Sequence, residues 1–227
     1  MDFQTELLTD LALPYLVRRG ADDGMVLVLA HGFGANEGDL FAIADSLAAS
    51  LTVICPRAPL PLMMQGGYAW FELSGGPDGV TWDAGQARRC LAIYERFVEG
   101  ALALYAGGTP ERVILGGFSQ GAGMSGALLI ARPDLAGAAL LLSGIEAGAV
   151  LNDASIDGEA TRLSDKQVLL MHGTTDEVVP FHHAQATREL LRQLGADVAL
   201  ISYPMGHELS YEQLADIVEW LQDVGAG

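Results

Sequence analysis

Residues 113–131 carry the pattern that decides the fold: Val113-Ile-Leu-Gly-Gly-Phe-Ser-Gln-Gly-Ala-Gly-Met-Ser-Gly-Ala-Leu-Leu-Ile-Ala131. The apolar run 113–118 predicts a buried strand, and the small and apolar residues 120–131, stopped by Pro133, predict a helix. Between them, Gly117-Phe-Ser-Gln-Gly121 has the spacing G-x-S-x-G. In this context the pentapeptide predicts a sharp turn that pushes the Ser119 hydroxyl into a cleft, with glycines where a β-carbon would collide with the neighbouring strand and helix. A Gly-Ser turn with no reactive role is the alternative.

The same alternation of strand and helix extends in both directions from this stretch. Short apolar runs and longer segments of helical period are typical of parallel strands joined by helices. We expect further strands at 25–30, 51–55, 135–143, 167–171 and 198–203, helices at 37–49 (capped by Asn36), 181–194 and 211–224, and a long helix ending near Tyr105. Residues 56–79 predict rim loops, and residues 144–165 predict a surface loop instead of a cap domain. The chain therefore predicts one α/β domain over residues 1–227, a mostly parallel twisted sheet with helices on both faces.

The composition limits the classes of partner. Half of the 227 residues are apolar and 18% are charged, as in a compact globular protein. Because 12 basic against 29 acidic residues give a net charge of −17, we expect neither a nucleic-acid partner nor a stable membrane association. The first residues lack the basic region of an export signal, which favours a cytoplasmic location. Cys55 and Cys90 are expected to be reduced, with a single bridge left open, and no metal-ligand set accompanies them.

A serine hydroxyl is a weak nucleophile near neutral pH, so it needs a base, and the base needs a group that orients it. With the nucleophile in such a turn, the acid and the histidine follow in that order, each just after a strand. Asp176 in His172-Gly-Thr-Thr-Asp-Glu-Val-Val-Pro180 and His207 in Met205-Gly-His-Glu208 occupy these positions. The sequence therefore predicts Ser119, Asp176 and His207 as a catalytic triad.

Other residues near these motifs have competing interpretations. Glu177 is the alternative acid, although Asp176 sits one residue nearer the strand. His172 is expected to be a packed or hydrogen-bonded structural residue. His182 and His183 open a helix and are expected at the surface or the pocket rim, without the further ligands that a metal site requires.

Backbone amides are expected to stabilise the oxyanion of the reaction. Gln120 follows the nucleophile at a helix N-terminus, where the helix dipole favours negative charge. The second amide is expected from Phe33 in Ala30-His-Gly-Phe-Gly34, a glycine-flexible loop after a strand. A tight turn without this role is the alternative for residues 30–34.

At this point the chain resembles the phospholipase/carboxylesterase family of α/β-hydrolases, which includes acyl-protein thioesterases and small bacterial carboxylesterases. The likeness covers Val26 to Leu221 and rests on Leu29-Ala-His-Gly-Phe-Gly34, Pro56-Arg-Ala-Pro59, Gly67-Tyr-Ala-Trp-Phe71, Gly117-Phe-Ser-Gln-Gly121, His172-Gly-Thr-Thr-Asp176 with Val178-Val-Pro180, and Gly206-His207. The resemblance implies an α/β-hydrolase fold without a large cap domain, the triad and amide donors named above, and no cofactor. It also implies that the loop 60–65 lines the acyl site, with Leu62, Met63 and Trp70 as substrate-binding residues; packing at the rim is the alternative for these three.

Three functions follow from these observations. A carboxylesterase acting on small-molecule esters of small to medium acyl chain is favoured, because the resemblance to acyl-protein thioesterases implies a longer loop than 60–65 for long-chain substrates. A thioesterase or lysophospholipase comes second, and a catalytically silent small-molecule binding protein on the same fold comes third. Activity is expected to fall toward acid pH because the base must be neutral. The sequence leaves a homodimer open.

Overall fold

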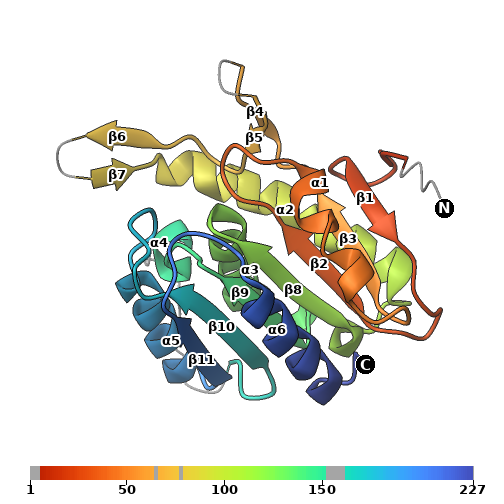
Figure 1. Ribbon diagram of the computed structural model, residues 1–227. Helices are drawn as coiled ribbons and strands as arrows, with labels where there is room; N and C mark the ends of the chain where they lie inside the picture. The colour runs from red at the N-terminus through yellow and green to blue at the C-terminus, as the bar shows by residue number, and fades with distance from the viewer. Residues whose placement is uncertain (1–5, 64–65, 77–78, 152–161, 227) are drawn as a thin grey trace.

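The computed structural model describes residues 6–63, 66–76, 79–151 and 162–226. Within these residues, seven strands form one sheet in the order β1-β3-β2-β8-β9-β10-β11 (Figure 1). The strands are β1 (Tyr15–Arg18), β2 (Val26–Ala30), β3 (Thr52–Pro56), β8 (Val113–Phe118), β9 (Ala138–Leu142), β10 (Gln167–Gly173) and β11 (Asp197–Tyr203). Strand β1 runs antiparallel to β3, and every other pair of neighbours in this sheet is parallel. The mostly parallel sheet is therefore confirmed.

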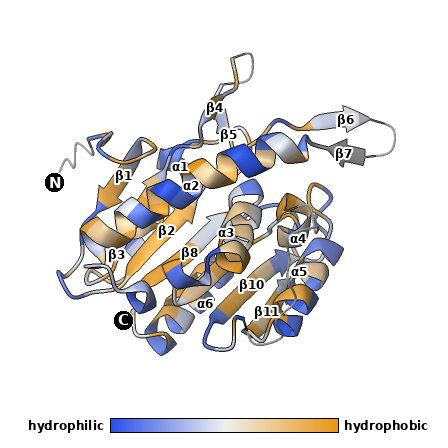
Figure 2. Ribbon diagram, turned by 180° about the vertical axis from the view of Figure 1, so that it is seen from behind, coloured by the Kyte–Doolittle hydropathy of each residue, from blue (hydrophilic) through white to orange (hydrophobic). Residues whose placement is uncertain are grey.

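Helices cover both faces of the sheet (Figures 1 and 2). On one face, α1 (Glu37–Phe41) and α6 (Tyr211–Asp223) insert Leu40, Ile217 and Leu221 into an apolar cluster. The opposite face is covered by α2 (Ala84–Tyr105), α3 (Gln120–Ala131), α4 (Ala147–Leu151) and α5 (His182–Gln193), whose apolar residues join a second cluster. This arrangement confirms the predicted α/β-hydrolase fold.

Burial on both faces explains why the central strands are apolar throughout. In β2, Val28 belongs to the cluster under α2 and α3, whereas its neighbours Leu27 and Leu29 belong to the cluster under α1 and α6. Successive side chains of a strand point to opposite faces, so a strand covered on both sides needs an apolar residue at every position. All five residues of β2 are accordingly buried.

Two predicted elements are shorter in the structure. The helix expected at 37–49 ends at Phe41 and is followed by a 3₁₀ turn, Ala44–Ser46. Ala44 and Leu47 still reach the core, so the 3₁₀ turn buries the same apolar residues whose spacing predicted a longer helix. The strand expected at 135–143 spans Ala138–Leu142, because Pro133–Leu135 forms another 3₁₀ turn before it. The capping role of Asn36 is confirmed: its side chain accepts from the backbone N–H of Gly38, 2.8 Å away.

Other elements were not predicted. The first strand, β1, escaped notice because a four-residue edge strand leaves little periodicity in the sequence. Part of the expected surface loop 144–165 forms α4, whose Ala147, Val150 and Leu151 are buried; residues 152–161 lie outside the described residues. The expected rim loops contain two hairpins, β4 (Leu60–Pro61) with β5 (Tyr68–Ala69) and β6 (Ser74–Gly76) with β7 (Gly79–Thr81).

Two further findings concern the described part of the chain. It contains no helix that is both long and apolar enough to cross a membrane. Cys55 and Cys90 are both free and buried.

Candidate active site

The turn between β8 and α3 holds Ser119 in a strained conformation. Its φ of 55° and ψ of −116° lie outside the ordinary regions for a residue with a side chain. The flanking glycines make this turn possible. A β-carbon on Gly117 would lie 2.6 Å from the carbonyl oxygen of Ala30, and one on Gly121 would lie 2.1 Å from the same atom. The G-x-S-x-G spacing is therefore required by the close approach of β2 to this turn.

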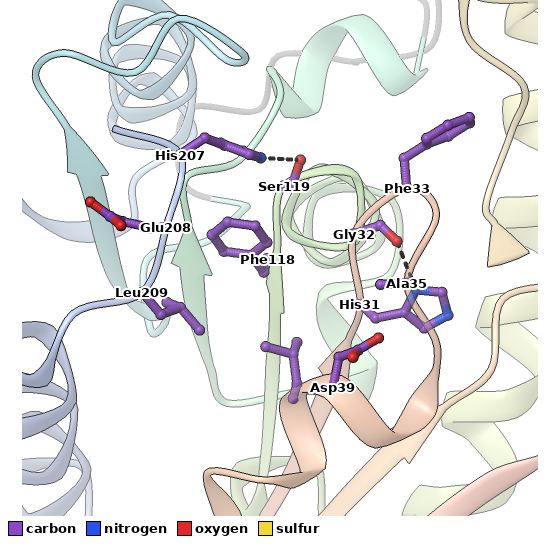
Figure 3. Close-up of a pocket in the computed structure, with 11 residues that line it drawn as sticks. His31, Gly32, Phe33, Ala35, Asp39, Phe118, Ser119, His207, Glu208 and Leu209 are labelled. Carbon is purple, nitrogen blue, oxygen red and sulfur yellow. Dashed lines mark hydrogen bonds between the residues drawn. The ribbon is translucent and has the colours of Figure 1, made fainter. Parts of the chain in front are cut away.

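Three side chains from distant parts of the chain meet at the carboxyl ends of the strands. The Ser119 Oγ lies 2.9 Å from Nε2 of His207, and Nδ1 of the same ring lies 2.7 Å from Oδ2 of Asp176 (Figure 3 shows the first contact). His207 follows β11, and Asp176 follows β10, which lies beside it. The structure thus brings together the three residues that the sequence predicted as a triad.

Asp176 is fixed on its other side as well. Its Oδ1 accepts hydrogen bonds from the backbone N–H groups of Val178, at 2.9 Å, and Val179, at 2.8 Å. The side chain is fully buried, so each of its oxygens has a defined partner and the carboxylate cannot rotate freely. This leaves Oδ2 to orient the imidazole of His207.

His207 is positioned by packing in addition to this hydrogen bond. Its ring lies 4.7 Å from the ring of Phe118, the last residue of β8. The side chain is only 15% exposed, so the imidazole is held at the edge of a cleft and not in open solvent. A neutral ring with a proton on Nδ1, donated to Asp176, presents Nε2 as an acceptor for the serine proton.

The two residues predicted to supply oxyanion donors lie close to Ser119. Phe33 lines the cavity that contains Ser119 and His207. Gln120 is the first residue of α3, so its N–H has no partner within the helix and the positive end of the helix dipole lies there.

The loop that carries Phe33 is held by a buried histidine that the sequence did not single out. His31 accepts a hydrogen bond at Nε2 from the backbone N–H of Ala58 and donates from Nδ1 to the carbonyl of Gly32. Burial lowers the pKa of His31, in keeping with a neutral ring that both donates and accepts. Its own carbonyl accepts from Nε1 of Trp70, 2.9 Å away.

A family comparison bears on this geometry. The model of the family described as Phospholipase/Carboxylesterase matches residues 15–224. The chain belongs to this family. Among its relatives, Acyl-protein thioesterase 1 of Gibberella zeae is 30% identical over 178 residues, which is 74% of this chain and 75% of that protein.

Solved structures agree with the family assignment. The crystal structure of a carboxylesterase from Mesorhizobium loti has a TM-score of 0.78 and 26% identity, and the match covers 96% of this chain and 98% of that one. The carboxylesterase of Bacillus cereus also has a TM-score of 0.78 over 93% of this chain and 94% of its own, and at 21% identity this likeness bears on the fold alone. The chain is therefore a member of this enzyme family and has its hydrolase fold over nearly its whole length.

A cavity of about 340 Å³ opens beside Ser119. It lies between the loop after β2, the start of α1 and the loop after β11, and His31, Gly32, Phe33, Ala35, Asp39, Leu40, Phe118, Ser119, His207, Glu208 and Leu209 line it (Figure 3). This volume is at the lower end of the range for small-molecule sites, so the cavity suits part of a small substrate.

The three residues predicted to bind substrate do not line this cavity. Trp70 is fully buried and packs against Tyr94, with ring centroids 4.9 Å apart, and it is not among the residues that line the cavity. Met63 is 91% exposed and Leu62 is half-buried on the β4–β5 hairpin side. Their role was implied by the family resemblance alone, and rim packing was the alternative given for all three.

The side chain of Gln120 explains what the segment around Trp70 does. Its Oε1 accepts from the backbone N–H of Trp70 at 2.9 Å, and its Nε2 donates to the carbonyl of Phe71 at 2.8 Å. Gln120 therefore ties the start of α3 to the segment that supports the Phe33 loop. Sequence analysis assigned this residue a backbone role and missed its side chain.

The competing residues lie apart from the Ser119–His207 contact. Glu177 is exposed, whereas its neighbour Asp176 makes the contact to His207. His172 is buried, and its Nε2 donates to the carbonyl of Val179, 2.7 Å away. His182 and His183 stack on each other at the start of α5, outside the cavity lining. Within the described residues, no group of three or more metal-ligating side chains is placed to hold a metal ion.

Proposed function

We propose that this protein hydrolyses carboxylic esters of small to medium acyl chain, with Ser119 as nucleophile, His207 as base and Asp176 as the group that orients the base. The observation that carries this proposal is the continuous chain of hydrogen bonds from Ser119 Oγ through His207 to Asp176, with distances of 2.9 and 2.7 Å. Nucleophile and base within hydrogen-bonding reach, and a third group fixing the base, are the signature of covalent catalysis by serine.

The reaction then proceeds in two halves. The Ser119 Oγ attacks the ester carbonyl carbon while its proton passes to Nε2 of His207, and the carbonyl oxygen becomes an oxyanion facing the amides of Phe33 and Gln120. The bond between the carbonyl carbon and the leaving oxygen breaks, and His207 returns the proton to that oxygen. Water, deprotonated by the same histidine, next attacks the acyl-enzyme, releases the carboxylic acid and restores the serine.

A thioester substrate is the second candidate. It is supported by relatives that carry the name acyl-protein thioesterase 1, among them the Gibberella zeae protein at 30% identity. The same nucleophile, base and donors serve both reactions, since only the leaving atom changes from oxygen to sulfur. Lysophospholipase activity needs a site for a longer acyl chain, and a silent binding protein needs no contact between Ser119 and His207.

A fluorophosphonate probe tests the nucleophile. We expect labelling of the native protein and none of Ser119→Ala; an unlabelled native protein, or equal labelling of the variant, would end the hydrolase proposal. Rates of hydrolysis of p-nitrophenyl esters against acyl thioesters of the same acyl chain then rank the two candidates. We expect the highest kcat/KM on esters of short and medium chains.

A further inference from the structure

A second cavity adjoins the one that contains Ser119. Its volume is about 260 Å³, and it is lined by Ile43, Leu209, Ser210, Tyr211, Leu214 and Ile217, from the segment after α1 and from α6 with the loop before it. Leu209 lines both cavities. In Figure 3, Leu209 lies near Glu208 and away from the Ser119–His207 contact. Leu209 is thus a wall that the two cavities share.

The second cavity is lined mostly by apolar side chains. Ile217 is buried, and Ile43 and Leu214 are partly buried against the same apolar cluster. The hydroxyl of Ser210 accepts from the backbone N–H of Gln213 as the cap of α6, so one of its acceptor positions is already used. Leu209 is 37% exposed and Tyr211 is 93% exposed, so the cavity is open to solvent on this side.

The charges beside these cavities have one sign. Asp39 and Glu208 line the first cavity, and among the described residues that line either cavity there is no lysine or arginine. A carboxylate or phosphate on the substrate would therefore meet repulsion and no partner. An uncharged chain would meet apolar side chains from Leu209 onward.

The position of His207 decides which part of the substrate reaches the second cavity. In the proposed reaction His207 returns its proton to the leaving oxygen, so the leaving group departs on the side of the imidazole. Glu208, Leu209, Ser210 and Tyr211 follow His207 directly in the chain and lead into α6. The path away from the imidazole therefore runs along this loop.

We propose that the cavity lined by Ile43, Leu209, Leu214 and Ile217 is a subsite for the leaving group, and that the preferred substrates are esters of uncharged, apolar alcohols several carbons long. This proposal rests on the proposed ester hydrolysis and names the substrate class of the same site. It excludes esters whose alcohol carries a negative charge.

Two isomeric esters separate the leaving group from the acyl chain. Hexyl acetate and methyl heptanoate have the same composition, but the long chain belongs to the alcohol in the first and to the acid in the second. In the acetate series, kcat/KM measured by pH-stat is expected to rise at least tenfold from ethyl to hexyl acetate, since each methylene buried in an apolar subsite is worth up to about fourfold. The anionic 6-acetoxyhexanoate is expected to react about tenfold more slowly than hexyl acetate, with a gap that narrows as salt is added.

Substitutions on α6 locate the subsite. Leu214→Trp fills the cavity and is expected to lower the ratio of kcat/KM for hexyl acetate over methyl heptanoate about tenfold. Ala215→Trp places the same indole on an exposed position of the same helix, outside the cavity lining, and is the matched control with an unchanged ratio. If Leu214→Trp does not fold, Leu214→Ala enlarges the cavity instead and is expected to shift the preference from hexyl toward octyl acetate.

The outcomes distinguish failure of the leaving-group subsite from failure of the proposed ester hydrolysis. A native protein that neither reacts with the fluorophosphonate nor cleaves p-nitrophenyl acetate ends the proposed hydrolysis. A protein that does both, but cleaves ethyl and hexyl acetate equally well, refutes the leaving-group subsite alone. The subsite is also refuted if Leu214→Trp lowers kcat/KM equally for hexyl acetate and methyl heptanoate, or lowers it for methyl heptanoate alone. It is refuted as well if 6-acetoxyhexanoate and hexyl acetate react at the same rate.

Discussion

The substitution Gly117→Ala tests whether the close approach of β2 shapes the nucleophile turn. A β-carbon at this position would lie 2.6 Å from the carbonyl oxygen of Ala30 and 2.6 and 2.8 Å from the carbonyl carbon and oxygen of Gly121. All three are backbone atoms, so none can rotate away. To restore an ordinary contact, β2 and the start of α3 must separate by roughly 0.8 Å.

This separation has an expected size in stability and in rate. Overpacking against backbone costs up to about 3 kcal/mol, which for a chain of this length lowers the melting temperature by roughly 6–12 °C. The strand β2 leads into the loop of Phe33, and α3 begins with Gln120, so the two proposed amide donors are expected to move apart. A misplacement approaching 1 Å is expected to lower kcat up to about a hundredfold.

The adjacent glycine provides the matched control. A β-carbon on Gly116 would first meet Cδ2 of Leu29 at 2.9 Å, the end of a flexible side chain. We expect Gly116→Ala to cost below about 1 kcal/mol and to leave kcat within a few-fold. Thermal unfolding by circular dichroism and kcat on p-nitrophenyl acetate check both variants. A Gly117→Ala protein as stable and as active as the native one, or a Gly116→Ala protein that is equally damaged, refutes the reasoning.

Three further substitutions test individual contacts. Asp176→Asn is expected to lower kcat by about 10⁴ with little change in folding. The amide oxygen of the asparagine must stay on the two backbone N–H groups, so its NH₂ faces Nδ1 of His207 and forces the wrong tautomer of the ring. Similar kcat values for the variant and the native protein would contradict this. The Arg57 guanidinium holds the pKa of the Glu37 carboxyl below its usual range. The stability that this pair contributes is therefore present above the ordinary carboxyl pKa and is lost as the pH falls through the lowered pKa. The difference in melting temperature between the native protein and Glu37→Gln should shrink below about pH 4, and a difference that stays constant with pH would count against this account. Burial lowers the pKa of His172, so the stability that its neutral ring contributes is complete above the ordinary histidine pKa and falls as the pH is lowered. In urea unfolding, His172→Phe should cost about 1–3 kcal/mol at about pH 8 and less at about pH 5. A larger cost at the lower pH would exclude this account.

The residues that meet at Ser119 could be predicted because their positions follow from local rules. Ser119 needs glycines on both sides, and Asp176 and His207 come directly after strands whose carboxyl ends share one edge of the sheet. Apolar periodicity gave the central strands for a similar reason, since they are buried on both faces. Neither inference needs the packing of distant side chains.

The elements that sequence analysis missed depend on tertiary contacts instead. The edge strand β1 exists because its four residues pair with β3, and nothing in Tyr15–Arg18 alone requires it. The helix expected at 37–49 stops at Phe41, since a 3₁₀ turn can also bring Ala44 and Leu47 to the core. The spacing of apolar residues predicts which residues are buried, but not which backbone conformation brings them into the core.

The segment around Trp70 shows why a motif can be recognised while its contacts stay hidden in the sequence. The family resemblance implied that Trp70 contacts substrate, whereas the segment around it makes hydrogen bonds to Gln120 through two backbone groups and to His31 through the indole N–H. These bonds join residues about fifty and forty positions apart, which spacing along the chain cannot disclose. The segment braces the loop that carries Phe33 against the start of α3, where Gln120 is the other proposed amide donor. Substitutions there should therefore act on kcat through the distance between the two donors, and much less on the affinity for substrate, because no atom of the buried indole reaches the cavity.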